Sequence, residues 1–250
     1  MNLSDNITGK IIVITGASSG LGETTARHLA SKGANVVLGA RREDKLKQIA
    51  TEINLIGKGK AIYLKTDVTK KDEVQALVAK AVQEFGKLDV IINNAGLMSI
   101  APMSETKVDE WERMIDINIK GVLYGIAAAL PIFQKQESGH FINLSSAAGV
   151  KVFSPGGTVY SGTKFAVSAI SEGLRHEVGG NIRTTSIAPG AIESELKHGS
   201  SHKESVDIVK EFYQSAIPAD AIARTIAFAI EQPANVDVNQ IILRPTVQEF

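Results

Sequence analysis

The fold is decided by residues 10–22, Lys10-Ile11-Ile12-Val13-Ile14-Thr15-Gly16-Ala17-Ser18-Ser19-Gly20-Leu21-Gly22. The first six form a run rich in β-branched side chains, typical of a strand buried on both faces of a parallel sheet. A helical pattern follows through Ala26, Leu29 and Ala30, and Gly33 ends it. Glycines between a strand and a helix let a pyrophosphate approach the helix N-terminus. The spacing is G-x-x-x-G-x-G, not the common G-x-G-x-x-G, so this stretch alone leaves phosphate binding and a plain turn equally open.

The rest of the chain alternates between strands and helices without a break in composition. Strands are expected at residues 35–39, 61–64, 88–92, 140–144, 182–187 and 238–243, and helices at 43–56, 70–85, 107–135, 158–178 and 218–230. Asn118 and Pro131 interrupt the longest helix and mark points where it can kink or end. The pattern predicts an α/β fold: one domain over residues 1–250, with a doubly wound, Rossmann-type parallel sheet of about seven strands and helices on both faces.

The composition is that of a globular protein with a sizeable core, since 44% of its residues are hydrophobic. Lysine plus arginine equal aspartate plus glutamate at 27 each, so nothing indicates a nucleic-acid or anionic-membrane partner. The lack of cysteine excludes disulfides and thiolate chemistry. Residues 1–10 are polar, unlike a signal peptide, and no apolar segment is expected to be long enough to span a bilayer. We therefore expect a cytoplasmic protein.

Tyr160 and Lys164 are four residues apart in a predicted helix, so their side chains share one face. A nearby cation favours the phenolate and is expected to pull the tyrosine pKa towards neutrality. On spacing alone a surface pair is the commoner outcome. Ser145 and Ser146 change the balance, because they follow the strand at 140–144, and ligands bind outside the carboxyl edge of open parallel sheets.

Arg41 and Arg42 follow the second strand, where an NAD-selective site usually places a carboxylate for the adenosine ribose. Arginine at this place accommodates a 2′-phosphate instead. The alternative is a solvated basic turn, because Glu43 and Asp44 continue the run of charges.

Residues 191–215 are polar, helical in places, and predicted to form a substrate flap over the sheet edge. His198 and His202 lie four apart in this segment, but no carboxylate or cysteine is clearly placed to complete a metal site. No metal is therefore expected.

The motifs together resemble the short-chain dehydrogenase/reductase family over nearly the whole chain. They are Thr15-Gly16-x-x-x-Gly20-x-Gly22, Asp67, Asn93-Asn94-Ala95-Gly96, Asn118, Ser146, Tyr160-x-x-x-Lys164 and Pro189-Gly190. Residues 237–245 look like the branch that contains NADP-dependent 3-hydroxy acid dehydrogenases and aldehyde reductases. One departure is that the usual serine position, thirteen residues before the tyrosine, holds Ala147. Ser146 keeps the Ser-x-x-Gly pattern, so we infer one extra residue in the 150–157 loop, with Ser145 as the fallback.

The resemblance implies a role for each matching residue. Tyr160 would be the general acid in reduction, Ser146 would bond the substrate carbonyl, and Asn118 would hold a relay water. Lys164 would bind the nicotinamide ribose and depress the tyrosine pKa. The cofactor would be held by Gly16, Ser18, Ser19, Gly20, Leu21, Gly22, Arg41, Arg42, Asp67, Val68, Asn94, Ala95, Gly96, Tyr160, Lys164, Pro189, Gly190, Ile192 and Ser194.

The sequence therefore predicts an NADP(H)-dependent oxidoreductase that interconverts a carbonyl (an aldehyde, ketone or 3-oxo acid) and an alcohol by hydride transfer. The rival hypothesis is a non-catalytic regulator that binds NADP(H) and senses its redox state. Such a sensor would be expected to have lost Ser146, Tyr160 or Lys164, and all three are present. We expect a homotetramer, or alternatively a homodimer, because the helices 107–135 and 158–178 carry more apolar positions than one sheet face needs.

Overall fold

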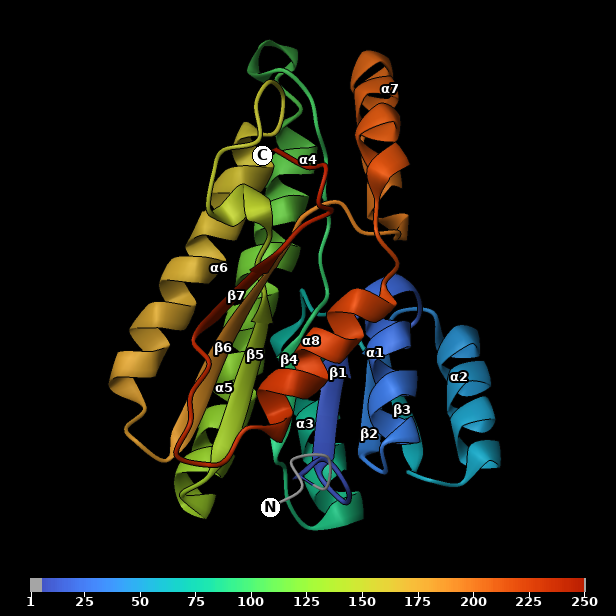
Figure 1. The fold of residues 1–250 in the computed structure, drawn as a ribbon, viewed down its shortest axis with the longest axis vertical. Coiled ribbons are helices and arrows are strands. Elements are labelled where there is room, and N and C mark those ends of the chain that lie inside the picture. The colour runs from blue at the N-terminus through green and yellow to red at the C-terminus, as the bar shows by residue number, and fades with distance from the viewer. Residues whose placement is uncertain (1–5, 250) are drawn as a thin grey trace.

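A seven-stranded parallel sheet forms the centre of the molecule (Figure 1), and the computed structural model describes residues 6–249. The strand order is β3-β2-β1-β4-β5-β6-β7. The strands are β1 (Ile11–Thr15), β2 (Asn35–Ala40), β3 (Ala61–Lys65), β4 (Val90–Asn93), β5 (Gly139–Leu144), β6 (Ile182–Pro189) and β7 (Gln240–Leu243). The predicted doubly wound Rossmann-type sheet is confirmed.

The strand order reverses at β1, which pairs with β2 on one side and with β4 on the other. Every residue of β1 is buried, as its run of β-branched side chains predicted. The crossovers on either side of β1 lead to opposite faces of the sheet. A crevice therefore opens outside the carboxyl ends of β1 and β4, where open α/β sheets bind their ligands.

Two hydrophobic cores lie on the two faces of the sheet. One face of the sheet is covered by the helices α1 (Gly20–Ser31), α2 (Glu43–Ile56) and α8 (Asp220–Glu231). The other face is covered by the helices α3 (Lys71–Phe85), α5 (Gly121–Gln136) and α6 (Thr158–Glu177). The second core includes Phe133 and Phe141, whose rings meet edge to face with centroids 4.9 Å apart. This double burial explains why the central strands β1 and β4 are almost entirely apolar.

The longest helical stretch is continuous but changes its winding where the sequence indicated. It runs through α4 (Val108–Met114), a π-helical turn (Ile115–Lys120) that contains Asn118, and α5. Pro131 lies inside α5 without ending it. Such π turns often lie at functional sites.

The expectation that no segment could span a bilayer was wrong on length and composition. The stretch Val108–Gln136 is 29 residues long and contains an 18-residue window with a mean hydropathy of 1.4. One face of it packs against the sheet through Val122, Ala129 and Phe133, so it serves as a core helix of this fold.

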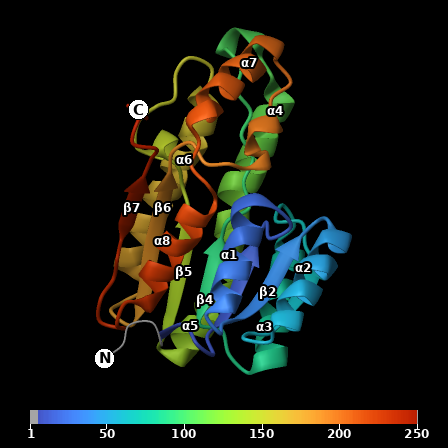
Figure 2. The ribbon, with the colours of Figure 1, turned by 45° about the vertical axis from the view of Figure 1, so that its right-hand side comes forward.

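Residues 191–215, predicted to be a flap, leave the sheet after β6 and return before α8. They contain two short 3-10 turns (Glu195–His198 and Tyr213–Ser215) and helix α7 (Lys203–Phe212), which stands beyond the sheet edge beside α4 (Figures 1 and 2). The two ends of the segment are tied together. Ile217 N donates to Ala191 O over 3.1 Å, and Glu193 N donates to Ile217 O over 3.0 Å. The two ends of the segment therefore lie next to each other.

The segment boundaries differ slightly from those predicted. Strand β4 begins at Val90 instead of residue 88, because the Asp89 carboxylate turns back to accept from Ile11 N over 2.7 Å. Strand β7 begins at Gln240 instead of residue 238. These two differences lie at the end of the sheet away from the crevice, whereas β6, predicted to end at residue 187, continues to Pro189 at the crevice.

Candidate active site

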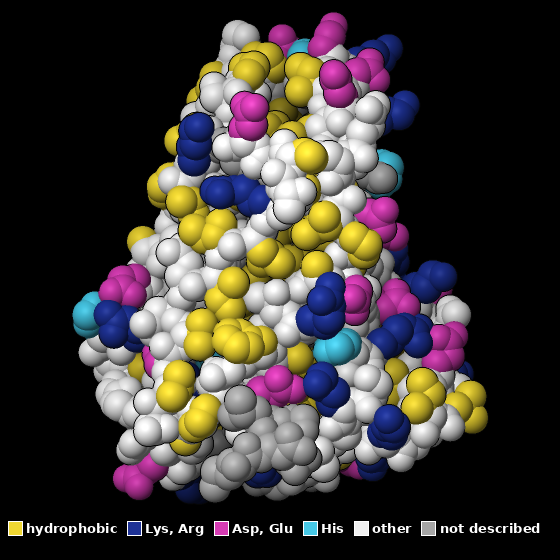
Figure 3. Space-filling view, viewed as in Figure 1, with side chains coloured by type: hydrophobic (Ala, Val, Ile, Leu, Met, Phe, Trp, Pro, Cys, Tyr) yellow, Lys and Arg dark blue, Asp and Glu magenta, His cyan; other side chains and the backbone are white. Residues whose placement is uncertain are grey.

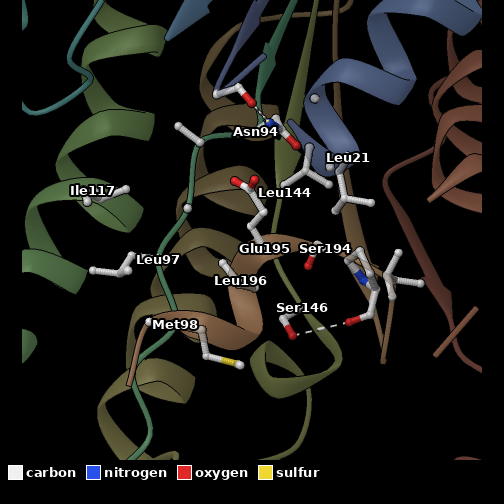
Figure 4. A pocket seen from close by; sticks show the side chains of 18 of the residues that line it. Leu21, Asn94, Leu97, Met98, Ile117, Leu144, Ser146, Ser194, Glu195 and Leu196 are labelled. Atoms are coloured by element: carbon white, nitrogen blue, oxygen red, sulfur yellow. Dashed lines mark hydrogen bonds between the residues drawn. The ribbon is translucent and has the colours of Figure 1, made fainter. Parts of the chain in front are cut away.

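A cavity of about 800 Å³ opens at the carboxyl edge of the sheet (Figure 4). This volume is in the range of pockets that bind cofactors and substrates. All the residues predicted to bind cofactor line it, together with Ser146 and the fallback Ser145. Of the predicted site residues, Asn118 alone lies behind the lining.

The glycine-rich turn needs its glycines because the backbone of the next strand approaches closely. Gly16 has φ +67°, and a Cβ there would lie 2.8 Å from Ala95 Cα. A Cβ on Gly22 would collide with Gly16 O. The resulting turn leaves the N-terminus of α1 open to the cavity, an arrangement that suits a phosphate group.

Asn94 fastens this turn to the end of β4. Its side-chain amide donates to Thr15 O over 2.8 Å, and its backbone N donates to Thr15 Oγ1 over 3.0 Å. Ala95 N donates to the same hydroxyl over 3.1 Å. Asn94 therefore shapes the cradle through contacts with protein backbone, while still lining the cavity.

The two serines after β5 have different surroundings. Ser145 is buried and bonded to α6, donating to Lys164 O over 3.0 Å and contacting Ser168 Oγ at 2.9 Å. Ser146 Oγ accepts from Ala148 N over 3.1 Å and donates to Pro189 O over 3.3 Å, and it lies close enough to the Tyr160 phenol to lower the pKa of that phenol. Figure 4 shows Ser146 in the cavity with this bond to Pro189. The structure therefore places Ser146 beside the phenol and gives Ser145 a packing role.

Burial dominates the electrostatics of the Tyr160–Lys164 pair. It raises the pKa of Tyr160 to about 12, and the hydrogen bond with Ser146 offsets part of that rise. Burial also lowers the pKa of Lys164 to about 8. The ammonium donates to Leu144 O over 2.8 Å and lies 5.9 Å from the centre of the Tyr160 ring. The expected lowering of the Tyr160 pKa by Lys164 was therefore wrong for this state of the protein.

Asn118 lies at the π turn, completely buried. Its side-chain amide donates to Leu97 O over 2.8 Å and to Thr163 Oγ1 over 3.0 Å, and its oxygen accepts from Leu97 N over 2.8 Å. These bonds join the segment after β4 to α6. They also occupy both amide hydrogens, so the predicted relay water would have to bind an oxygen of this residue.

The adenosine end of the cavity holds a cluster of hydrogen-bond donors. Arg42 bonds to Ser18 Oγ at 3.2 Å and to Ser19 Oγ. It also forms a salt bridge with Glu195, at 2.9 Å from Nη2 to Oε2 and 3.2 Å from Nη1 to Oε1. Arg41 lines the same cavity on the side of Asp67, whose carboxylate accepts from Thr69 N over 3.0 Å. Arg42 is therefore the arginine that meets the glycine-rich turn.

Several lining residues belong to none of the sequence motifs, although four of them lie in the predicted flap at 191–215. Most are apolar and surround the phenol end of the cavity: Leu97, Met98, Phe153, Leu196, Val209, Phe212 and Tyr213. Burial raises the pKa of Tyr213, and the nearby Tyr160 phenol adds to that rise. Glu195 was also missed, because nothing in its sequence surroundings signals a contact with a residue 153 positions away.

Of the two histidines in the flap, His202 has ordinary protein partners. His202 Nδ1 contacts Ser205 Oγ at 2.9 Å, and its Nε2 lies 3.0 Å from the Glu204 carboxylate. Among residues 6–249, no group of three or more histidine, cysteine, aspartate or glutamate side chains is arranged to hold a metal ion.

Comparison with known proteins places the chain in a family. The short chain dehydrogenase family matches residues 10–205. The chain is also 53% identical over 249 residues to an uncharacterized oxidoreductase of Staphylococcus saprophyticus, covering 98% of this chain and 100% of that one. The protein belongs to the short-chain dehydrogenase/reductase family and is an oxidoreductase of that family.

Two solved structures show what similar proteins bind. The closed form of serine dehydrogenase complexed with NADP+ is 29% identical with a TM-score of 0.87, covering 96% of both chains. A short-chain dehydrogenase/reductase from Burkholderia phymatum in complex with NAD is 26% identical with a TM-score of 0.87, covering 95% of this chain and 89% of that one. Both neighbours bind a nicotinamide dinucleotide, but they differ in the 2′-phosphate.

Proposed function

We propose that this protein is an NADP(H)-dependent oxidoreductase that interconverts a carbonyl compound and an alcohol, with Tyr160 as the general acid in reduction and the general base in oxidation. The observation that carries this proposal is that Ser146 and Tyr160 line the same cavity, with the Ser146 hydroxyl close enough to lower the pKa of the Tyr160 phenol. Two hydroxyls at one point can bond one carbonyl oxygen together, which polarises the carbonyl and orients it.

The residues of the cavity fit a nicotinamide dinucleotide. The glycine-rich turn and the N-terminus of α1 supply a backbone cradle for the pyrophosphate. Arg42, Ser18 and Ser19 supply donors for a 2′-phosphate, which favours NADP(H) over NAD(H). We propose that Asp67 and Val68 lie near the adenine and that Ile192 and Ser194 lie near the nicotinamide. When bound, the cofactor would donate or accept the hydride.

Tyr160 suits proton donation as the structure stands. With its pKa raised to about 12, the phenol is protonated at neutral pH and ready to donate to a developing alkoxide. Ser146 would hold the carbonyl oxygen against the phenol while the proton moves. Lys164 has three N–H donors, one of which bonds Leu144 O. We propose that another binds the nicotinamide ribose and that the ammonium helps to stabilise the phenolate.

The walls around the phenol indicate the part of the substrate next to the carbonyl. Phe153 and Phe212 pack against each other with ring centroids 5.4 Å apart, and Met98 and Val209 join the same apolar cluster. Such walls suit an apolar group beside the carbonyl. We propose an aldehyde, ketone or 3-oxo acid. The 3-oxo acid is suggested by the resemblance of residues 237–245 and by the serine dehydrogenase neighbour, since serine is a 3-hydroxy acid.

We further propose a single NADP-binding domain in a cytoplasmic homotetramer, with a homodimer as the alternative. Two separate faces carry exposed apolar side chains. One lies on α4, the π turn, α5 and α6, with Val108, Ile115, Leu123 and Phe165, and the other on α8, β7 and their flanks, with Phe228, Val236, Ile242 and Val247. Figure 3 shows hydrophobic side chains gathered across one face of the molecule. Two self-complementary faces can build a tetramer with dihedral symmetry, and a monomer by light scattering would contradict this.

The proposal is tested by NADPH oxidation against a panel of aldehydes, ketones and 3-oxo acids, with Tyr160→Phe as the matched control. The expected result is turnover by the wild type and loss of turnover in the variant. NADPH binding without turnover of any panel member would favour the redox-sensing regulator.

A further inference from the structure

The donor cluster at the adenosine end is occupied by a carboxylate of the protein itself. Glu195 accepts two hydrogen bonds from the Arg42 guanidinium and a third from Ser19 Oγ over 2.7 Å. The bonds from Arg42 and then Ser19 are the main reasons that the pKa of Glu195 is lowered. A guanidinium and serine hydroxyls form an anion site, and here the anion is Glu195.

This carboxylate comes from the flap and reaches across the cavity. Glu195 opens the first 3-10 turn of the flap, while Ser19 precedes α1 and Arg42 follows β2. The neighbouring Ser194 also approaches the glycine-rich turn, since a Cβ on Gly20 would lie 3.5 Å from Ser194 Cβ. Figure 4 shows Ser194, Glu195 and Leu196 together in the pocket. The flap therefore rests on the glycine-rich turn through two consecutive residues.

The contact is weak enough for a ligand to break. The side chains of Arg42 and Glu195 are 44% and 61% exposed, and exposed ion pairs contribute little free energy because water and salt screen them. A phosphate dianion is the stronger ligand for the same donors because it carries more charge and three acceptor oxygens. Two anions cannot share the cluster without repulsion.

We propose that Glu195 is a specificity-determining latch: its carboxylate occupies the site of the ribose 2′-phosphate, so that binding of NADP(H) displaces it and frees the flap from the glycine-rich turn. The inference rests on the proposed cofactor. NAD(H) has no 2′-phosphate and so does not compete with Glu195. The latch therefore weakens the binding of NADP(H) but not of NAD(H), and it reduces the preference for NADP(H) over NAD(H) that Arg42 creates. By linkage, any substrate that holds the flap in the latched position weakens the binding of NADP(H). NADP(H) in turn weakens the binding of that substrate by the same factor.

The test uses fragments that differ only in the 2′-phosphate. Adenosine 2′,5′-bisphosphate and 5′-AMP are titrated by calorimetry into the wild type, Glu195→Gln and the control Glu193→Gln. Glu193 is an exposed flap residue two positions away, so the control removes the same charge from the same segment. We expect Glu195→Gln to bind the bisphosphate about threefold or more tightly while 5′-AMP changes by less than about twofold. Glu193→Gln should match the wild type for both ligands.

A second measurement follows the flap itself. Trypsin cleavage after Lys203 or Lys210 in α7 should be faster in Glu195→Gln than in the wild type, and the bisphosphate should accelerate cleavage of the wild type alone. An unchanged bisphosphate affinity in Glu195→Gln, or equal changes for both fragments, would overturn the latch. Failure of the proposed function is distinct, because it would appear as an absence of turnover while the fragment affinities still respond to Glu195→Gln.

Discussion

The cavity has a floor, formed by Ser146, Tyr160 and Lys164, and a flap, formed by residues 191–215. The two are built in opposite ways. On the floor, Tyr160 and Lys164 are each 5% exposed and stand on helix α6, and the Lys164 ammonium is bonded to Leu144 O at the end of the buried strand β5. In the flap, Glu195 holds Arg42 through a solvent-exposed salt bridge, while residues farther along the same loop are bonded to the segment after β4, as in the bond from Ile100 N to Ser200 Oγ at 2.8 Å. Groups that must keep their geometry through a reaction are thus fixed by burial, whereas a contact that must break when a ligand enters stays exposed.

Burial on the floor disfavours the ionised forms of its side chains, whereas the ion pair of the flap stays exposed to water. Burial makes the phenol of Tyr160 a weaker acid and the ammonium of Lys164 a stronger one. Both shifts disfavour the ionised forms, so in this state the floor holds a neutral proton donor beside a lysine that is charged at neutral pH. The following predictions test this division from the largest expected effect to the smallest.

Replacing Tyr160 with Phe should lower the turnover number by about 100- to 10,000-fold, because the proton donor is removed while the ring and its packing remain. NADPH binding should stay nearly unchanged, since the cradle does not depend on the hydroxyl. Steady-state kinetics and a binding titration on the same sample check both parts. Wild-type turnover in the variant would remove Tyr160 from the mechanism.

The adjacent serines provide a matched pair of variants. Ser146→Ala removes a hydroxyl that lines the cavity beside the phenol, so kcat should fall by about 100- to 1,000-fold. Ser145→Ala removes packing bonds to Lys164 O and Ser168, so it should lower the melting temperature more than kcat. The reverse pattern in kinetics would make Ser145 the reactive serine.

Lys164 should give the floor a pH-dependent stability. Its pKa is about 8 when folded and near its ordinary value of 10.5 when unfolded, so between these two values the unfolded chain binds more protons. Stability of the wild type relative to Lys164→Met should therefore rise as the pH increases from about 8 to about 10, by roughly 2–3 kcal/mol at 1.36 kcal/mol per pKa unit. Urea denaturation at several pH values measures it, with the exposed Lys210→Met as control. A stability difference that does not change with pH would mean that burial does not lower the pKa of Lys164.

Most of the fold could be predicted from the sequence because its signal is local and repeated. Strands such as β1 and β4 are apolar runs that end at glycine or asparagine, and parallel pairing buries such runs on both faces. The boundaries of β4 and β7 were missed because Asp89 and the residues before Gln240 are governed by contacts with distant segments. The apolar helix through α4 and α5 was misjudged because its polar residues do not interrupt its hydropathy enough.

The site was predictable where one residue type does a job that no other can. Gly16 and Gly22 are needed for close backbone approach, and Tyr160 and Lys164 follow from helical spacing. The direction of the Tyr160 pKa was missed because burial cannot be read from spacing. Glu195 was missed because its contact with Arg42 depends on how the flap folds back.

The preference between NADPH and NADH should be the smallest of these effects. It concerns the flap, because it depends on Arg42, the residue that Glu195 of the flap contacts. NADPH should be preferred over NADH by at least about tenfold in kcat/KM at low salt, because a guanidinium–phosphate contact is charge-assisted. The preference should narrow as ionic strength rises. Ala40→Asp with Arg41→Ala should move the preference towards NADH, and Arg42→Gln should do so more than Arg41→Gln, since Arg42 is the arginine bonded to Ser18 and Ser19. Equal use of both cofactors by the wild type would show that the arginines form only a solvated turn.

The most direct test of the account is the transfer of deuterium from NADPH labelled at nicotinamide C4 to the product of a carbonyl that the protein reduces. Labelled cofactor of each C4 configuration is supplied separately, and the product alcohol is analysed by mass spectrometry. We expect one of the two labels to appear on the former carbonyl carbon with the wild type, and no labelled product with Tyr160→Phe over the same time. Oxidation of NADPH without label in the product, or labelled product formed equally well by Tyr160→Phe, would contradict hydride transfer on the Ser146–Tyr160–Lys164 floor.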